Sequence, residues 1–282
     1  MKIAILSDSH GNVPALKTVI EHIEAWQPNH IIFNGDVINR GPKSLESWRI
    51  VQAKRKNDGW LMTRGNHEDY ILLHENEEPD ATHTGIIAEI NQNSVWTHQQ
   101  VKAHCPEIAT LPDDQIITAP DDSHIYITHA SVRHNRDGIF PEQSETIISQ
   151  QIDRNAAVFV TSHIHMAYTK QIGETLLVNS GSAGQHCWGD TRASYAQVTW
   201  QNGRWHAKII RLTYDMVATE RDYYQSGFMD ETGPIAHLIF QEWKTGQVIL
   251  PDWRDCYMQA VLTGEISLET SVYRTLNKYG IS

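Results

Sequence analysis

The sequence predicts an α/β protein with mixed sheets, and three observations lead to this prediction. Short apolar runs recur along the first two thirds of the chain, and the first of them leads through a polar cluster into a helical pattern. Two longer runs near residue 200 are joined by an Asn-Gly turn, which is typical of an antiparallel hairpin. The 282 residues are enough for one large core or two modest domains.

The first strand-helix unit is expected at the N-terminus. Lys2–Leu6 is a short apolar strand, and Asn12 is a typical helix cap with Pro14 in the first turn behind it. Apolar residues then follow at helical spacing: Leu16, Val19, Ile20 and Ile23. This pattern predicts the opening of a βαβ unit.

Further strands are expected at residues 31–33, 60–62, 125–127, 157–160 and 176–178. Each is followed closely by a polar cluster: Gly35-Asp36, Gly65-Asn66, His129, His163 and Asn179-Ser180-Gly181. Residues 194–200 and 205–212 flank the turn Gln201-Asn202-Gly203-Arg204 and form the expected hairpin. The sheets are therefore mixed, and their strand ends carry the polar residues.

Two segments fall outside this pattern. Residues 74–120 are polar and lack strand alternation, so we expect helices and loops that form an insertion or lid beside the site. Residues 216–282 follow the hairpin and form a C-terminal extension packed on the core, with a final helix at 268–279. A packing appendage, a dimer surface and a cap over the substrate remain open for this extension. Residues 1–215 are the expected catalytic domain.

Composition narrows the function classes. A formal charge of −11 argues against binding to a nucleic-acid polymer, which depends on basic surface. The apolar N-terminal run is interrupted by Asp8 and His10, too early for a signal peptide or a membrane span, so we expect a cytoplasmic protein without membrane contact. The three cysteines are far apart and form no CxxC pair, which argues against a disulfide framework or a zinc finger. The sequence leaves open whether the chain forms a homo-oligomer.

The polar clusters provide candidate metal ligands. Ligands of open α/β sheets gather where strands end, and side chains two residues apart on an extended strand point the same way. Asp8 with His10 and His163 with His165 have this spacing, and a carboxylate such as Asp36 can bridge two cations. The full set of candidate ligands is Asp8, His10, Asp36, Asn66, His129, His163 and His165.

These motifs resemble the calcineurin-like metallophosphoesterases. The resemblance rests on Asp8-Ser9-His10-Gly11, Gly35-Asp36 through Arg40-Gly41, Gly65-Asn66-His67-Glu68, His129, Ser162-His163-Ile164-His165, Asn179-Ser180-Gly181-Ser182 and Arg192-Ala193-Ser194-Tyr195. The last two of these motifs are similar to those of a bacterial branch that includes phosphodiesterases and a diadenosine tetraphosphate hydrolase. The resemblance implies a four-layer α/β/β/α sandwich with a dinuclear metal site at the strand ends.

The resemblance also implies how the ligands divide. One metal ion would be held by Asp8, His10, Asp36 and His165, and the other by Asp36, Asn66, His129 and His163. Such pairs lie about 3.5–4 Å apart and clamp phosphate esters. Mn, Fe and Zn all suit a mixture of imidazole, carboxylate and amide ligands.

The implied reaction is attack on phosphorus by a hydroxide held between two ions. His67 is the expected proton donor to the leaving group, and Arg40 the expected phosphate ligand. Further substrate contacts are expected from Arg64, Arg133 and Arg136. The expected substrate is a small phosphorylated molecule, either a nucleotide or a dinucleoside polyphosphate.

Two alternatives remain. A phosphoprotein phosphatase is the first, but members of that class have Asp where this chain has Asn39. A noncatalytic scaffold is the second, and the complete ligand set together with His67 argues against it. Other departures from the family pattern stand in loops beside ligands: Ala130, Ser162 and Ser180.

Overall fold

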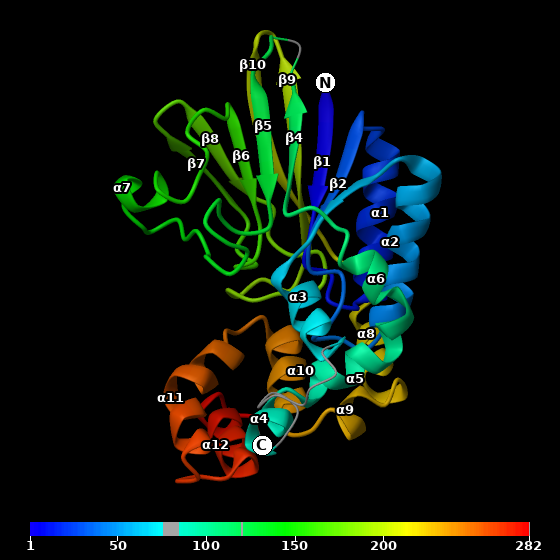
Figure 1. The fold of residues 1–282 in the computed structure, drawn as a ribbon, viewed down its shortest axis with the longest axis vertical. Coiled ribbons are helices and arrows are strands. Elements are labelled where there is room, and N and C mark those ends of the chain that lie inside the picture. Colours follow the sequence, from blue (N-terminus) through cyan, green and yellow to red (C-terminus); the bar gives the residue numbers. More distant parts are fainter. Residues whose placement is uncertain (76–84, 120, 282) are drawn as a thin grey trace.

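Strand β1 (Lys2–Leu6) lies at the centre of one of two five-stranded sheets in the computed structural model, which describes residues 1–75, 85–119 and 121–281 (Figure 1). The first sheet has the order β10-β9-β1-β2-β3. Its other strands are β2 (His30–Asn34), β3 (Leu61–Thr63), β9 (Ala193–Gln201) and β10 (Arg204–Leu212). Strand β1 pairs in parallel with β2 and antiparallel with β9, so the sheet is mixed as predicted.

The second sheet has the order β4-β5-β6-β8-β7. Its strands are β4 (Asp114–Thr118), β5 (His124–Thr128), β6 (Val158–Thr161), β7 (Tyr168–Ile172) and β8 (Thr175–Asn179). The three inner strands run parallel, and both edge strands are antiparallel to their neighbours.

The two sheets enclose an apolar core. Ile3 and Ile5 of β1 pack with Ile125 and Ile127 of β5 in this core, all without solvent exposure. Ala4 and Leu6, which alternate with Ile3 and Ile5, face the helices on the other side of the sheet. A strand buried on both faces is apolar throughout, which explains why the sequence pattern located these strands.

Helices cover the outer face of the first sheet. They are α1 (Val13–Trp26) and α2 (Ser44–Asp58). Asn12 caps α1 as predicted, because its side chain accepts a hydrogen bond from the backbone N–H of Ala15 (3.2 Å). Figure 1 shows both helices lying along β1 and β2.

The outer face of the second sheet has a thinner cover. Ile139, Ile148 and Ile152 pack on Phe159 and Leu177 of this sheet. The covering segment contains only the short helix α7 (Glu145–Ile148). The four layers implied by the family resemblance are present, but the fourth is mostly irregular chain.

Below the strand ends lies a group of helices (Figure 1). From the middle of the chain come α3 (Asn66–Leu72), η1 (Leu73–Glu75), α4 (Gly85–Ile90), α5 (Gln92–Val101), η2 (Lys102–His104) and α6 (Cys105–Ile108). From its end come α8 (Met216–Gln225), α9 (Phe228–Glu231), α10 (Ile235–Thr245), α11 (Leu250–Leu262) and α12 (Leu268–Lys278). The C-terminal helices share a separate core with Ile90 and Trp96. The expected final helix is confirmed.

The sequence prediction was wrong at two edge strands. Residues 74–120 were expected to contain helices and loops, yet β4 lies within them; positions 76–84 and 120 of this segment lie outside the described residues. Strand β7 was not predicted either. Both are edge strands with polar, partly exposed residues, and Ile116 in β4 is 57% exposed, so neither shows an apolar run.

The Asn-Gly hairpin is confirmed. Gln201 pairs with Arg204, and the two turn residues Asn202 and Gly203 have φ of 53° and 73°. Within the described ranges, no helix is both long and apolar enough to cross a membrane.

Candidate metal centre

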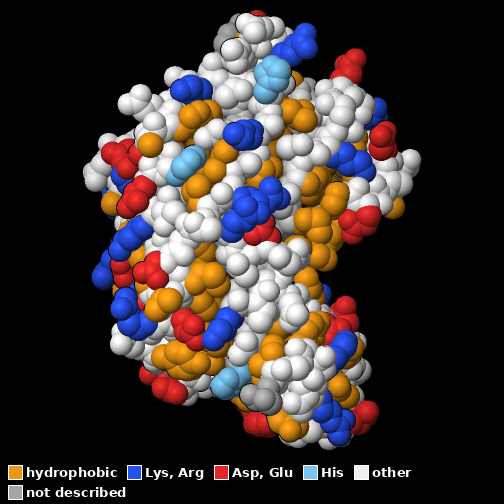
Figure 2. Space-filling view, turned by 180° about the vertical axis from the view of Figure 1, so that it is seen from behind, with side chains coloured by type: hydrophobic (Ala, Val, Ile, Leu, Met, Phe, Trp, Pro, Cys, Tyr) orange, Lys and Arg blue, Asp and Glu red, His pale blue; other side chains and the backbone are white. Residues whose placement is uncertain are grey.

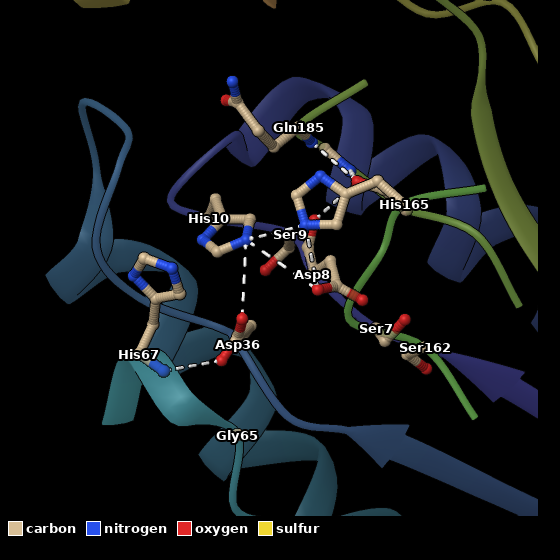
Figure 3. Close-up of polar contacts among 12 residues, drawn as sticks. Ser7, Asp8, Ser9, His10, Asp36, Gly65, His67, Ser162, His165 and Gln185 are labelled. Atoms are coloured by element: carbon tan, nitrogen blue, oxygen red, sulfur yellow. Dashed lines mark hydrogen bonds and ion pairs between the residues drawn. The ribbon is translucent and has the colours of Figure 1, made fainter. Parts of the chain in front are cut away.

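The seven candidate ligands lie just beyond strand ends of both sheets and face one another. Asp8 and His10 follow β1, and Asp36 follows β2. His129 directly follows β5, and His163 lies two residues beyond β6. Figure 3 shows the side chains of Asp8, His10, Asp36 and His165 turned toward one centre. Both sheets therefore contribute to this centre.

Five of these residues have an unusual backbone. The φ angles of Asp8, His10, Asp36, His163 and His165 are 54°, 46°, 59°, 66° and 59°. The sequence argument placed the paired ligands on extended strand ends, and that conformation is wrong. A left-handed backbone is uncommon for residues with a side chain and costs of order 1 kcal/mol or more, and such strain clusters at functional sites.

Asp8, His10 and His165 form the first group of donors. His165 Nε2 lies 3.1 Å from Asp8 Oδ1 and 3.3 Å from His10 Nε2. His10 Nε2 lies 3.8 Å from Asp8 Oδ1. Two imidazole nitrogens and one carboxylate within this distance of each other can hold one metal ion.

Asp36, His129 and His163 form a second group. His129 Nε2 lies 3.3 Å from Asp36 Oδ2 and 3.1 Å from Asn66 Oδ1. Asp36 Oδ2 also lies 3.7 Å from His10 Nε2 of the first group. One carboxylate oxygen therefore stands between the two groups, as a bridging ligand would.

Backbone carbonyls orient two of the imidazoles. His129 Nδ1 lies 2.8 Å from the carbonyl oxygen of Asn34, and His10 Nδ1 lies 3.2 Å from that of Asn39. A histidine whose Nδ1–H donates to a carbonyl presents Nε2 as the free donor atom. In both residues Nε2 is the nitrogen that faces the centre.

The buried carboxylates favour a cation. Both carboxylate oxygens of Asp8 are buried and accept no hydrogen bond in the described part of the chain. Burial raises the pKa of Asp36, but His129 and His67 outweigh it and hold this pKa well below its ordinary value. Burial lowers the pKa of His129, whereas Asp36 and Asp8 raise it more, to about 10. Buried negative charge of this kind fits residues that hold metal ions.

Glu68 fixes the loop that carries Asp36. Its carboxylate accepts four backbone N–H bonds, from Asp36 (2.8 Å), Val37 (2.9 Å), Ile38 (3.4 Å) and Gly65 (2.9 Å). Burial, followed by the nearby charge of Asp36, raises the pKa of Glu68 to about 7, and the backbone N–H bonds oppose this rise. Glu68 joins the start of α3 to the end of β2, a role that its place in the Gly65-Asn66-His67-Glu68 motif did not reveal.

Gly41 and Gly65 are required by close approach. A Cβ at Gly65 would lie 2.1 Å from Asp36 Oδ1, and one at Gly41 would lie 1.8 Å from the carbonyl oxygen of His10. No larger residue fits at these positions without moving a candidate ligand.

Asn39 determines which nitrogen of His67 carries hydrogen. The backbone N–H of Arg40 (2.9 Å) and the Nδ2 of Asn93 (3.2 Å) both donate to Asn39 Oδ1, which fixes the orientation of the amide. Asn39 Nδ2 therefore donates to His67 Nδ1, at 3.0 Å. The hydrogen of a neutral His67 is then on Nε2. Burial holds the pKa of His67 well below its ordinary value, with Asp36 acting in the opposite direction.

A pocket of about 420 Å³ opens beside this centre. Asp36, Asn66, His67, His163 and His165 line one end of it. Figure 2 shows the surface hollowed on one side, between the sheets and the C-terminal helices.

Arg40 is the predicted substrate-binding arginine that lines the pocket, and no carboxylate of the described residues pairs with its guanidinium. Arg64, Arg133 and Arg136 do not line it. Arg64 pairs with Asp69 and Asp113 (each 2.9 Å). Sequence reasoning missed Arg254 of α11, which does line the pocket, because nothing in the sequence places α11 there.

The positions of Arg133 and Arg136 differ from each other. Arg133 pairs with Asp137 at 2.6 Å in an exposed loop. The guanidinium of Arg136 lies 4.5 Å from the centre of the Tyr70 ring, and Tyr70 lines the pocket. Contact of Arg64, Arg133 or Arg136 with substrate remains a prediction.

Residues 1–203 match a family described as the calcineurin-like phosphoesterase superfamily domain. Serine/threonine-protein phosphatase 4 catalytic subunit of Eremothecium gossypii is 38% identical over 98 residues, which is 34% of this chain and 30% of that protein. The symmetrical bis(5′-nucleosyl)-tetraphosphatase of Baumannia cicadellinicola is 28% identical over 115 residues, 40% of this chain and 33% of that protein. The matches thus span about a third of these relatives.

Two solved structures share the fold. A metallophosphoesterase from Sphaerobacter thermophilus has a TM-score of 0.65 at 21% identity, covering 87% of this chain and 99% of its own. A hypothetical protein from Pyrococcus horikoshii has a TM-score of 0.69 at 17% identity, covering 87% and 98%. At these identities the likeness concerns the fold alone.

Proposed function

Because this chain belongs to the calcineurin-like phosphoesterase superfamily, we propose that it uses two metal ions to hydrolyse a nucleotide or a dinucleoside polyphosphate. The observation that carries the proposal is the convergence of imidazole and carboxylate donors at the end of a pocket that also contains Arg40. A cationic side chain beside a metal centre suits an anionic phosphate ester.

The chain offers two ligand sets with one shared carboxylate. We assign Asp8, His10, Asp36 and His165 to one ion, and Asp36, Asn66, His129 and His163 to the other. The buried carboxylate of Asp8, which accepts no hydrogen bond from the described residues, and the place of Asp36 between the two groups fit this assignment. When bound, the two ions supply Lewis-acid activation of water and stabilise charge on the phosphate. The mixed donors suit Mn, Fe and Zn.

Two other side chains act on the substrate in this proposal. Arg40 binds phosphate oxygens through its planar guanidinium. His67 lies next to the centre, with its ring centroid 4.8 Å from that of His10. In this proposal its protonated form gives the Nε2 proton to the leaving-group oxygen and returns to the neutral imidazole. Asn39 donates a hydrogen bond from Nδ2 to Nδ1 of His67 and therefore does not accept one from it. At this position the chain has an amide in place of a carboxylate that would stabilise a positively charged His67.

A nucleotide substrate is supported by the space beside the centre. The pocket is within the usual size range of sites for small organic ligands, so it is larger than a lone phosphate requires. The name of the second curated relative, a bis(5′-nucleosyl)-tetraphosphatase, points to the same substrate class.

A phosphoprotein phosphatase is the second candidate. The 38% identity to serine/threonine-protein phosphatase 4 catalytic subunit over 98 residues favours it. Against it stand Asn39 and a pocket walled by the C-terminal helices, which leaves less room for a polypeptide.

The test begins with metal analysis of the purified protein. A panel of dinucleoside polyphosphates, nucleotides, simple monoesters and phosphopeptides is then assayed with the identified metal. We expect about two ions per chain and the highest kcat/KM for a nucleotide or dinucleoside polyphosphate. If a phosphopeptide or a simple monoester is preferred, the substrate assignment is wrong, and if no ester is hydrolysed, the proposed function is wrong.

A further inference from the structure

The pocket has a second half that lies outside the metal centre. The part of its lining that comes from α4, α10 and α11 is mainly apolar, with Arg254 of α11 as a charged member. Its apolar residues are Ile90, Ile235, Ile239, Leu250, Trp253 and Met258. Helices α10 and α11 follow residue 203, where the family match ends. These helices therefore add something to the site that the shared family domain does not provide.

This apolar wall is anchored from behind. Ile235, Ile239 and Trp253 are at most 3% exposed and belong to the core of the C-terminal helices. The Trp253 Nε1–H donates to Ser271 Oγ at 2.8 Å, which fixes the indole against α12. The wall is built by packing within the protein and does not need a ligand to form.

Met258 differs from these residues. It is partly exposed and lines the pocket, yet it is absent from the apolar cores formed by the described residues. Methionine has a flexible thioether, so Met258 can adapt to the shape of a ligand in this pocket.

Another part of the lining is polar. Asn93 and Ser94 of α5 line the pocket together with Asn91. Asn93 Nδ2 donates to Asn39 Oδ1 at 3.2 Å, and Ser94 Oγ lies 2.7 Å from His74 Nε2. The lining thus combines an aliphatic and aromatic part with a part that carries amides and a hydroxyl.

We infer that this half of the pocket binds the nucleoside part of the substrate, with the base against the α10–α11 wall and its polar edge toward α5. The inference rests on the proposed function and makes the C-terminal helices the part of the protein that selects the substrate. A flat heteroaromatic base has apolar faces and a polar edge. A face can pack on the apolar residues of α10 and α11, and the edge can form hydrogen bonds with the polar residues of α5. An acyl chain has no polar edge to form hydrogen bonds with the side chains of α5.

The contribution of the nucleoside is measured with two phosphonates that the enzyme cannot hydrolyse. One is the analogue of adenosine monophosphate in which CH2 replaces the bridging oxygen, and the other is methylphosphonate. Calorimetric titration of the Mn²⁺-loaded protein gives the ratio of their dissociation constants. We expect the nucleoside analogue to bind about 10- to 100-fold more tightly, as burial of a ring-sized apolar group predicts.

Two variants test the apolar wall. Met258→Glu on α11 and Ile90→Ala on α4 should each reduce the ratio by about 10-fold. Gln259→Glu places the same charge on the next residue of α11, which is exposed, and should leave the ratio unchanged. Met258 is partly exposed, so its variant is expected to fold.

The inference is overturned if the two phosphonates bind equally, or if Met258→Glu and Gln259→Glu give the same ratio. Failure of the proposed function gives a different result, in which the nucleoside analogue binds in preference but no phosphate ester is hydrolysed. The two failures are therefore distinguishable.

Discussion

Replacing Glu68 by Gln should weaken both the fold and the metal centre. One oxygen of Glu68 accepts the N–H groups of Asp36 and Gly65, and the other accepts those of Val37 and Ile38. An amide NH2 in place of either oxygen leaves two buried donors without an acceptor. At about 1–3 kcal/mol for each unsatisfied donor, the free energy of unfolding should fall by roughly 2–6 kcal/mol.

The measurement is urea unfolding of the metal-free and metal-loaded protein, together with metal content. We expect Glu68→Gln to lose metal more readily, because the loop that carries Asp36 is no longer held against α3. Glu46→Gln is the matched control, since Glu46 pairs with Lys17 at the surface of α2 and should contribute less than about 1 kcal/mol. Equal unfolding midpoints and metal content for Glu68→Gln and the wild type would refute this account of Glu68.

Four further predictions concern other residues. Asp36→Asn should abolish turnover, because the charge shared by the two ligand groups is lost; substantial activity with two ions bound would contradict the ligand assignment. His67→Ala should slow esters with alkoxide leaving groups ~10²–10⁴-fold and spare p-nitrophenyl esters; equal losses would show that His67 only positions the substrate. Asn39→Asp should raise the pKa of His67, because a carboxylate beside Nδ1 stabilises the imidazolium, and should increase kcat for alkoxide esters; an unchanged ratio of rates between alkoxide and p-nitrophenyl esters would exclude this. Asp137→Asn should lower the free energy of unfolding by about 1 kcal/mol at pH 7. Burial raises the pKa of Asp137, but hydrogen bonds, the largest from Arg133, outweigh it and lower this pKa to about 2. Since that pKa is below its ordinary value, the stabilisation is present above pH 4 and is lost toward pH 2. The difference in unfolding free energy between the wild type and the variant should therefore be smaller at pH 3 than at pH 7 in urea unfolding.

The inner strands could be predicted from sequence because they are buried on both faces. Ile3 and Ile5 face one layer while Ala4 and Leu6 face the next, so the whole run is apolar. Edge strands lack this signal. Ile116 of β4 is 57% exposed and Ile117 is its only buried residue, so the segment has no buried apolar run and is made a strand by its pairing with β5.

The candidate ligands could also be predicted, because strand ends of both sheets meet at one edge. The conformation of the ligands could not, since a left-handed backbone at Asp8 or His163 is imposed by neighbouring loops and leaves no local sequence pattern. The same holds for Arg254, which lines the pocket only because α11 packs with α4. Features that depend on distant partners are invisible in a single sequence.

The division of the ligand set between two sheets has a consequence for folding. Asp8, His10 and Asp36 come from loops of the first sheet, whereas His129 and His163 come from loops of the second. Ions bound by both groups would cross-link the two halves of the sandwich at this edge. Free energy of metal binding then adds directly to the free energy of unfolding, by about 2.7 kcal/mol when free metal is 100 times its Kd. The concentration of available metal would thus determine the stability of the folded protein as well as its catalytic rate.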